Sequence, residues 1–103
     1  MPYMIETFDR PGSLDLRAAT RDAHLVFLDA NKHLLLACGA KLNDDGSTAG
    51  GGLYVVDLDN RAEAEAFIAA DPFSTAGLFD RVVITRWRKA YVDGVCHLPQ
   101  VAS

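Results

Sequence analysis

His24 is the residue whose type and position first suggest chemistry. It lies in the middle of residues 14–31, a stretch with the length of a helix and no glycine or proline. Because successive helical residues are turned by about 100°, three aspartates share one narrow arc that must face water, namely Asp15, Asp22 and Asp29. His24 falls on the opposite, leucine-rich arc. The pattern predicts an imidazole directed inward, and a core histidine bonded to a backbone carbonyl is the alternative.

Asp71 is the candidate partner for that imidazole. It follows the apolar face of a second predicted helix, one turn after Phe67, and precedes Pro72. A carboxylate at a helix C-terminus is unfavourable by up to about 1 kcal/mol, and a proline moves the preceding residue out of the α region. An Asp-Pro pair is also a normal start for a short helical turn. The two roles can coexist, because a carboxylate has about four acceptor sites.

A histidine and an aspartate in contact can transfer protons. The carboxylate fixes the tautomer of the imidazole and stabilises its charged form, while the imidazole takes a proton from a hydroxyl or carbon acid and returns it to another atom. Such assistance is typically worth about 10² to 10⁴ in rate. Elimination of a halide from an activated phenol and isomerisation of an enol-type ring both fit this chemistry.

Three more side chains are candidates for binding a substrate. Arg21 lies one turn before His24 on the stripe that also carries Arg17, where a guanidinium can hold an oxyanion or a carboxylate; a surface or interface ion pair is the alternative. Ser74 follows the Asp-Pro pair and is a candidate for the same cleft, although hydroxyls are common after an N-cap. Trp87 is expected to pack in a core or an interface, with pocket lining as its other role.

The elements that must position these residues follow a clear order. Asn60 and Glu63 form a capping-box-like start for the second helix, which runs to about residue 70. Strands are predicted over 2–8, 33–42, 53–58 and 81–92, with a flexible hairpin connection at 43–52. The order β-α-β-β-α-β is that of the α+β, ferredoxin-like fold, a four-stranded antiparallel sheet with two helices on one face. Residues 93–103 are expected to form a C-terminal extension with little structure of its own.

The two middle strands are apolar on both of their sides. Leu34, Leu36, Cys38 and Ala40 alternate with Leu35 and Ala37, and Tyr54 and Val56 alternate with Leu53 and Val55. A sheet with one solvated face would show polar residues at alternate positions. The face away from the helices is therefore expected to be covered, and in so small a chain the simplest cover is a second copy. The sequence predicts a homodimer formed through this sheet face.

Composition excludes several classes of partner. The 103 residues are 50% hydrophobic and 23% charged, which is typical of one ordinary domain. The net charge is −4 and the ten Lys and Arg residues are dispersed apart from "RWRK" at 86–89, so nucleic acid is not expected as a partner. No apolar run approaches the roughly 20 residues of a membrane span, and the N-terminus lacks a signal-peptide pattern. We expect a cytoplasmic protein.

No cofactor or metal is expected. His33 and His97 make no metal-ligand spacing with His24. The "AGGG" at 49–52 is not followed by the helix and Lys-Ser/Thr of a phosphate-binding loop, and it is expected to give the hairpin backbone its freedom. The two cysteines, Cys38 and Cys96, lie far apart in sequence and are predicted to be reduced thiols in ordinary packing.

Several motifs together resemble the YciI-like (YCII) family of small bacterial domains. They are the R-x-x-H-L at 21–25, the leucine-rich strand with "CGAKL", the glycine-bearing hairpin, the A-x-x-F helix and the "DPF" and "AGL" of 71–78, in family order over about residues 2–90. The resemblance implies a dimeric α+β barrel, with a YCII-like domain over 1–92. It also implies a His–Asp pair, here His24 and Asp71, in a cleft beside the dimer interface.

The resemblance suggests two classes of function. Some family members are similar to dehydrochlorinases that act on chlorinated hydroxyquinols, and related barrels isomerise lactones without cofactors. The first hypothesis is therefore a cofactor-independent lyase or isomerase that acts on a small cyclic or aromatic substrate through His24 and Asp71. The second is a non-catalytic, small-molecule-binding or accessory dimeric domain in which His24 and Asp71 only satisfy each other's hydrogen-bonding groups. A cavity that reaches His24 favours the first hypothesis, and a sealed pair favours the second.

Overall fold

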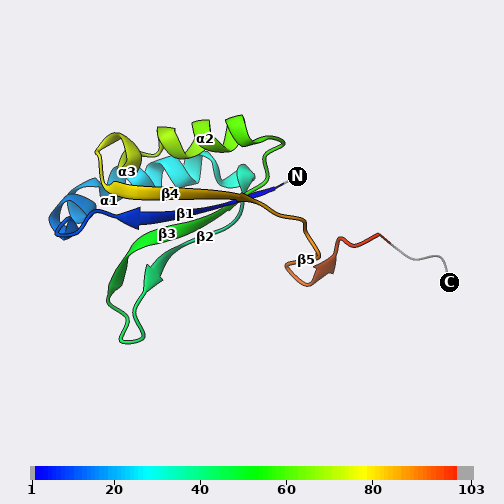
Figure 1. The fold of residues 1–103 in the computed structure, drawn as a ribbon, viewed down its shortest axis with the longest axis horizontal. Coiled ribbons are helices and arrows are strands. Elements are labelled where there is room, and N and C mark those ends of the chain that lie inside the picture. The colour runs from blue at the N-terminus through cyan, green and yellow to red at the C-terminus, as the bar shows by residue number, and fades with distance from the viewer. Residues whose placement is uncertain (1, 100–103) are drawn as a thin grey trace.

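A four-stranded antiparallel sheet forms the centre of the molecule. The computed structural model describes residues 2–99. The strand order is β2-β3-β1-β4, with β1 (Tyr3–Asp9) paired to both β3 (Thr48–Val56) and β4 (Phe79–Arg86), and β2 (Leu35–Leu42) at one edge. Figure 1 shows the helices gathered on one side of this sheet and the β2–β3 hairpin extending beyond it. The predicted α+β, ferredoxin-like fold is confirmed.

Side-chain hydrogen bonds to the backbone mark the end of the first helix and the start of the second. The first, α1 (Leu14–Ala30), ends where the Asn31 side-chain amide donates to the Phe27 carbonyl at 2.9 Å. The second, α2 (Arg61–Ala70), has the expected cap, because Asn60 Oδ1 accepts from the backbone N–H of Glu63 at 2.9 Å. A short α3 (Pro72–Thr75) follows directly, and a single 3₁₀ turn, η1 (Lys32–Leu34), links α1 to β2. The predicted strand at 33–42 therefore begins two residues later, at Leu35.

The hydrophobic core lies between the sheet and the helices. The inward residues of β1 and β3 are buried against α2, and they comprise Tyr3, Ile5, Tyr54 and Val56 on the sheet and Ala64, Phe67 and Ile68 on the helix. Phe27 and Leu28 of α1 pack against the same cluster. This burial fixes α1 and α2 on the sheet, and with them the side chains at their ends.

The glycines of the predicted hairpin connection belong to β3. Phe8 pairs with Gly51 and Thr7 pairs with Gly52, so the strand begins at Thr48 rather than at residue 53. Gly51 has a φ of +148°, and a Cβ there would lie 2.0 Å from the Thr7 carbonyl oxygen. The missing side chain therefore permits a close approach of two backbones, which alternation of residue types does not reveal.

The last strand is shorter than predicted. It runs over Phe79–Arg86 instead of 81–92, because its antiparallel partner β1 begins at Tyr3, opposite Arg86; just beyond, the Trp87 N–H bonds to the Pro2 carbonyl at 3.2 Å. The chain then forms a separate hairpin from β5 (Tyr91–Val92) and β6 (Val95–Cys96), so the predicted boundary at residue 92 lies inside a hairpin. Residues 100–103 of the expected extension lie outside the described residues.

The sheet surface turned away from the helices, here called the outer face, is largely apolar. It carries Met4, Glu6, Phe8, Leu53, Val55 and Val83 by strand alternation. An irregularity between Leu35 and Ala37 changes the alternation expected for β2. Leu35 packs against the core, whereas Leu36 and Ala37 both line a hollow of about 420 Å³ on the outer face. The predicted two-sided apolar character is present, but the residues of β2 divide differently between the faces.

Candidate active site

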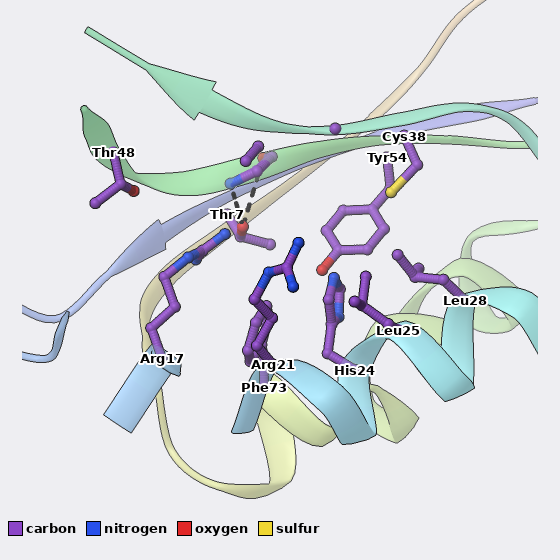
Figure 2. Close-up of a pocket in the computed structure, with 13 residues that line it drawn as sticks. Thr7, Arg17, Arg21, His24, Leu25, Leu28, Cys38, Thr48, Tyr54 and Phe73 are labelled. Atoms are coloured by element: carbon purple, nitrogen blue, oxygen red, sulfur yellow. Dashed lines mark hydrogen bonds between the residues drawn. The ribbon is translucent and has the colours of Figure 1, made fainter. Parts of the chain in front are cut away.

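A cavity of about 330 Å³ lies between α1 and the strands β2 and β3. Figure 2 shows Arg17, Arg21 and His24 reaching from α1 toward the strands, with Tyr54 facing them. The lining residues are Thr7, Arg17, Arg21, His24, Leu25, Leu28, Cys38, Gly39, Ala40, Thr48, Gly52, Tyr54 and Phe73. The volume is at the small end of the range of about 300–1,000 Å³ for ligand sites. It suits a single ring better than a large cofactor.

His24 forms one wall of this cavity and is held on three sides. Its ring stacks on Phe73 with the centroids 4.0 Å apart and an interplanar angle of 16°, and its edge faces Tyr54. Nδ1 lies 2.9 Å from each carboxylate oxygen of Asp71. Because an ionised carboxylate only accepts, Nδ1 carries the hydrogen and Nε2 of the neutral ring presents a lone pair. Among the described residues Nε2 has no hydrogen-bond partner.

Asp71 lies behind His24 and is fully buried. Its Oδ1 also accepts from the Phe73 N–H at 2.9 Å, and its Oδ2 accepts from the Tyr54 hydroxyl at 2.8 Å. The residue caps α3 and contacts the imidazole at once, so the two roles considered for it coexist. Asp71 does not line the cavity. Any part it has in chemistry must act through His24.

Two further groups beside the cavity are held in their protonated forms. Burial, helped by the negative charge and hydrogen bond of Asp71, raises the pKa of Tyr54 far above its usual range, so the phenol remains a donor. Burial and the charge of Asp71 raise the pKa of the Cys38 thiol to about 11. Cys38 belongs to the exposed edge strand, and Figure 2 shows its sulfur beside the Tyr54 ring. Neither group is a ready nucleophile near neutral pH.

The two arginines of the cavity have different surroundings. Arg17 donates to Asp9 Oδ2 at 2.7 Å and lies over the Phe73 ring, 4.8 Å from its centroid. Arg21 is exposed, lines the cavity, and has no ion-pair or hydrogen-bond partner in the part of the chain that the structure describes. The guanidinium of Arg21 is therefore available to a ligand.

Ser74 and Trp87 do not belong to this cavity. Ser74 lies half-buried in α3, where its N–H bonds to the Asp71 carbonyl oxygen at 2.8 Å. Trp87 lines the outer-face hollow with Met4 and Val55, and its Nε1 is buried without a partner among the described residues. Of the five residues predicted from the sequence, the structure brings together His24, Asp71 and Arg21.

Three residues of the site were not predicted as site residues. Tyr54 binds Asp71, Arg17 adds a second cation, and Thr7 lines the floor of the cavity while bonding Gly52. Arg17 could have been found, because it lies seven residues before His24 on the same helical stripe. Tyr54 and Thr7 carry only the signal of inward strand positions, which most core residues share.

The described residues contain no cluster of three or more histidine, cysteine, aspartate or glutamate side chains arranged to hold a metal ion. Within residues 2–99, no helix combines the length and the apolar character needed to cross a lipid bilayer.

Comparison with known proteins places the chain in a family. The profile of the YCII-related domain matches residues 1–88. The protein YciI of Escherichia coli O6:H1 is 30% identical over 98 residues, which cover 88% of this chain and all of that protein. An uncharacterized protein of Haemophilus influenzae is 32% identical over 98 residues, with the same coverage. The chain belongs to the YCII family. The resemblance inferred from the YCII motifs is thereby confirmed.

A solved structure gives this YCII domain a relative with a stated activity. The chain is similar to TftG of Burkholderia phenoliruptrix AC1100, a 5-chloro-2-hydroxyhydroquinone dehydrochlorinase in complex with 2,5-dihydroxybenzoquinone. The TM-score is 0.78 and the sequence identity is 32%, over 85% of this chain and 94% of TftG. An enzyme-like role is therefore plausible for this member of the YCII family.

Proposed function

We propose that the protein is a cofactor-independent lyase or isomerase that acts on a small cyclic or aromatic substrate through proton transfer by His24. The observation that carries this proposal is the asymmetry of the histidine: Nδ1 is fixed by the buried Asp71, whereas the ring lines an open cavity. A buried polar pair that served only stability would not need a cavity beside it.

In the proposed reaction, His24 Nε2 takes a proton from a ring hydroxyl or an acidic carbon of the substrate. Asp71 accepts from Nδ1 throughout and stabilises the imidazolium that forms, without taking the proton. In an elimination, the electron pair of the broken O–H or C–H bond moves into the ring and the carbon–halogen bond breaks with the halide leaving. In an isomerisation, the imidazolium returns the proton to another atom of the ring. No redox partner is needed in either case.

The similarity to TftG favours elimination as the first reaction to test. That relative is a dehydrochlorinase, and its complex holds a single dihydroxylated quinone ring. A cavity of about 330 Å³ accepts one substituted ring of this kind. We therefore propose hydroxylated, halogen-bearing six-membered rings as the first substrates for this chain, with lactones and enols as the alternatives that an isomerase would take.

The test is turnover on a panel of chlorinated hydroxyquinols, lactones and enols, followed by chloride release and by ultraviolet absorbance. We expect His24→Gln and Asp71→Asn to lower kcat by about 10² to 10⁴. Asparagine also caps helices, so Asp71→Asn removes the charge while keeping an acceptor for the Phe73 N–H. His33→Gln is the matched control, because His33 is exposed and outside the cavity. Equal rates in wild type and both site variants would reject the proposal.

A non-catalytic, small-molecule-binding dimeric domain is the second candidate function. The observation that favours it is the complete satisfaction of Asp71 by the protein itself, with donors from His24, Tyr54 and the Phe73 backbone. On this hypothesis the same panel binds to the cavity but no compound is converted. Binding without turnover by the wild-type protein would favour this function over the enzyme.

We also infer that two copies associate through the outer face. Leu53 and Val83 are exposed there by 38% and 37%, and the neighbouring Met4 and Val55 are half-buried. Glu6 lies between Leu53 and Val83 on the central strand β1 and pairs with Lys41 at 3.3 Å, so its charge is offset within the face. A contiguous group of exposed apolar side chains is typical of a protein interface. A second copy and a small molecule are thus the partners that we propose.

A further inference from the structure

Some polar side chains of the cavity already form hydrogen bonds within the protein, and others do not. Thr7 Oγ1 accepts from the Gly52 N–H at 2.9 Å, Thr48 Oγ1 accepts from the Gly50 N–H at 3.2 Å, and the Tyr54 hydroxyl donates to Asp71. Nε2 of His24 and the guanidinium of Arg21 have no hydrogen-bond or ion-pair partner among the described residues, whereas Arg17 is already bound to Asp9. A ligand of this cavity must therefore offer a hydrogen-bonding group to His24 and a group that pairs with the positive charge of Arg21.

The charges that line the cavity have one sign. No aspartate or glutamate is among the lining residues, and Asp71 is fully buried behind the His24 ring. Asp9 offsets the charge of Arg17 through their 2.7 Å contact. Nothing described offsets the charge of Arg21. A positive group beside a cavity attracts anions and repels cations.

The spacing along α1 brings this charge to the reacting end of the cavity. Arg21 and His24 are three residues apart, so their side chains lie on the same helix face, one turn from each other. Figure 2 shows the Arg21 guanidinium beside the imidazole and turned toward the strands. A single ring that presents a proton to His24 can place a neighbouring oxygen on Arg21.

We propose that the substrate is a small ring with one ionised oxygen, a carboxylate or an acidic enol, and that Arg21 selects it by binding this oxygen. The inference rests on the proposed function in that it assigns the substrate class of the same site. Arg21 then acts twice: it binds the charge of the substrate, and it stabilises the further negative charge that develops as His24 removes a proton. Neutral rings of the same shape bind weakly because they leave the guanidinium unpaired.

The experiment measures dissociation constants by isothermal titration calorimetry, so it does not depend on turnover. Benzoate and ionised tropolone are the anionic probes, and benzamide and the methyl ether of tropolone are their neutral counterparts. We expect each anion to bind at least tenfold more tightly than its neutral counterpart, less so at high salt. The tighter of the two anions distinguishes a carboxylate from an acidic enol.

Variants test whether Arg21 causes the preference for anionic probes. Arg21→Gln should remove the preference for anions, and Arg21→Lys should keep part of it, because lysine retains the charge without the planar fork. Arg88→Gln is the matched control, since Arg88 is exposed and does not line the cavity. His24→Gln should keep the preference for anions while losing turnover.

Three results would overturn the inference. They are equal affinity for charged and neutral probes, an Arg21→Gln variant that binds anions like the wild type, and failure of all four probes to bind at millimolar concentration. Normal turnover by His24→Gln would instead reject the proposed function and leave the Arg21 result standing. The two failures are therefore distinguishable.

Discussion

At the scale of single residues, the site depends on the hydrogen bonds that Asp71 accepts from three different groups. Three donors from different parts of the chain meet on one buried carboxylate: a helical imidazole, a strand phenol and the backbone of α3. Each donor restricts the rotation of this carboxylate. The orientation of His24 is thus fixed by Asp71, which does not line the cavity, and by Tyr54 and Phe73, which do.

Tyr54→Phe is expected to loosen this arrangement. Loss of the 2.8 Å bond to a buried carboxylate should lower the free energy of unfolding by about 1.5–3 kcal/mol. The loss should shrink in an Asp71→Asn background, because the two changes remove the same interaction. Urea denaturation of the four proteins of this double-mutant cycle measures the coupling. Tyr91→Phe, at an exposed tyrosine, is the control; additive losses at 54 and 71 would contradict the expectation.

Cys38 gives a pH-dependent prediction. Its pKa is raised from an ordinary 9.0 to about 11, so the neutral thiol is favoured by folding. The stability that this provides is fully present below about pH 9 and is lost as the pH rises through about 11. In a Cys96→Ser background, alkylation of the folded protein should be slower than that of the urea-unfolded chain at pH 8. Its rate should keep rising toward pH 11, and a plateau near pH 9 would contradict the raised pKa.

At the scale of elements, the floor of the site depends on how closely β3 approaches β1. Thr7 bonds the Gly52 backbone in both directions, with its Oγ1 accepting at 2.9 Å and donating at 3.4 Å. This contact requires backbones without side chains between them at Gly51 and Gly52. The glycine run therefore contributes to the shape of the cavity as well as to the hairpin.

Gly51→Ala is expected to destabilise the protein by at least about 2 kcal/mol. A Cβ would lie 2.0 Å from the Thr7 carbonyl oxygen, and a φ of +148° is a conformation that other residues rarely adopt. Thermal unfolding followed by circular dichroism measures the loss. Gly39→Ala is the matched control on the neighbouring strand, because a Cβ there meets nothing within 4 Å. Similar melting temperatures for both variants would show that the close approach is not required.

At the scale of the whole molecule, the two sides of the sheet carry different features. The helix side holds the core and the cavity with His24, and the outer face presents mostly apolar residues together with the Glu6–Lys41 pair. The C-terminal hairpin lies beyond the sheet, as Figure 1 shows, and its Tyr91 lines the outer-face hollow with Trp87. A partner on the outer face would therefore leave the entrance beside α1 open.

Leu53→Lys is expected to convert a dimer into a monomer. A third charge beside Glu6 and Lys41 would have to be buried on association, whereas in one chain Leu53 is already 38% exposed and lies opposite Glu6. Analytical ultracentrifugation measures the mass of each species. Val26→Lys is the control, because Val26 is exposed on α1. A Leu53→Lys protein with the same mass as the wild type and the control would contradict association through this face.

The sequence by itself determined the order of elements, the α+β fold, the caps of α2 and α3, and the inward direction of His24. These features depend on neighbours within a few residues, where periodicity and capping chemistry act. Only the tertiary structure decided that Tyr54 and Phe73 hold the His24–Asp71 contact, that Ser74 and Trp87 lie elsewhere, and that β3 includes its glycines. Those outcomes depend on contacts between residues far apart in the chain, such as the 47 positions between His24 and Asp71. Local sequence patterns do not indicate such long-range contacts, because many packings satisfy the same alternation of apolar and polar residues.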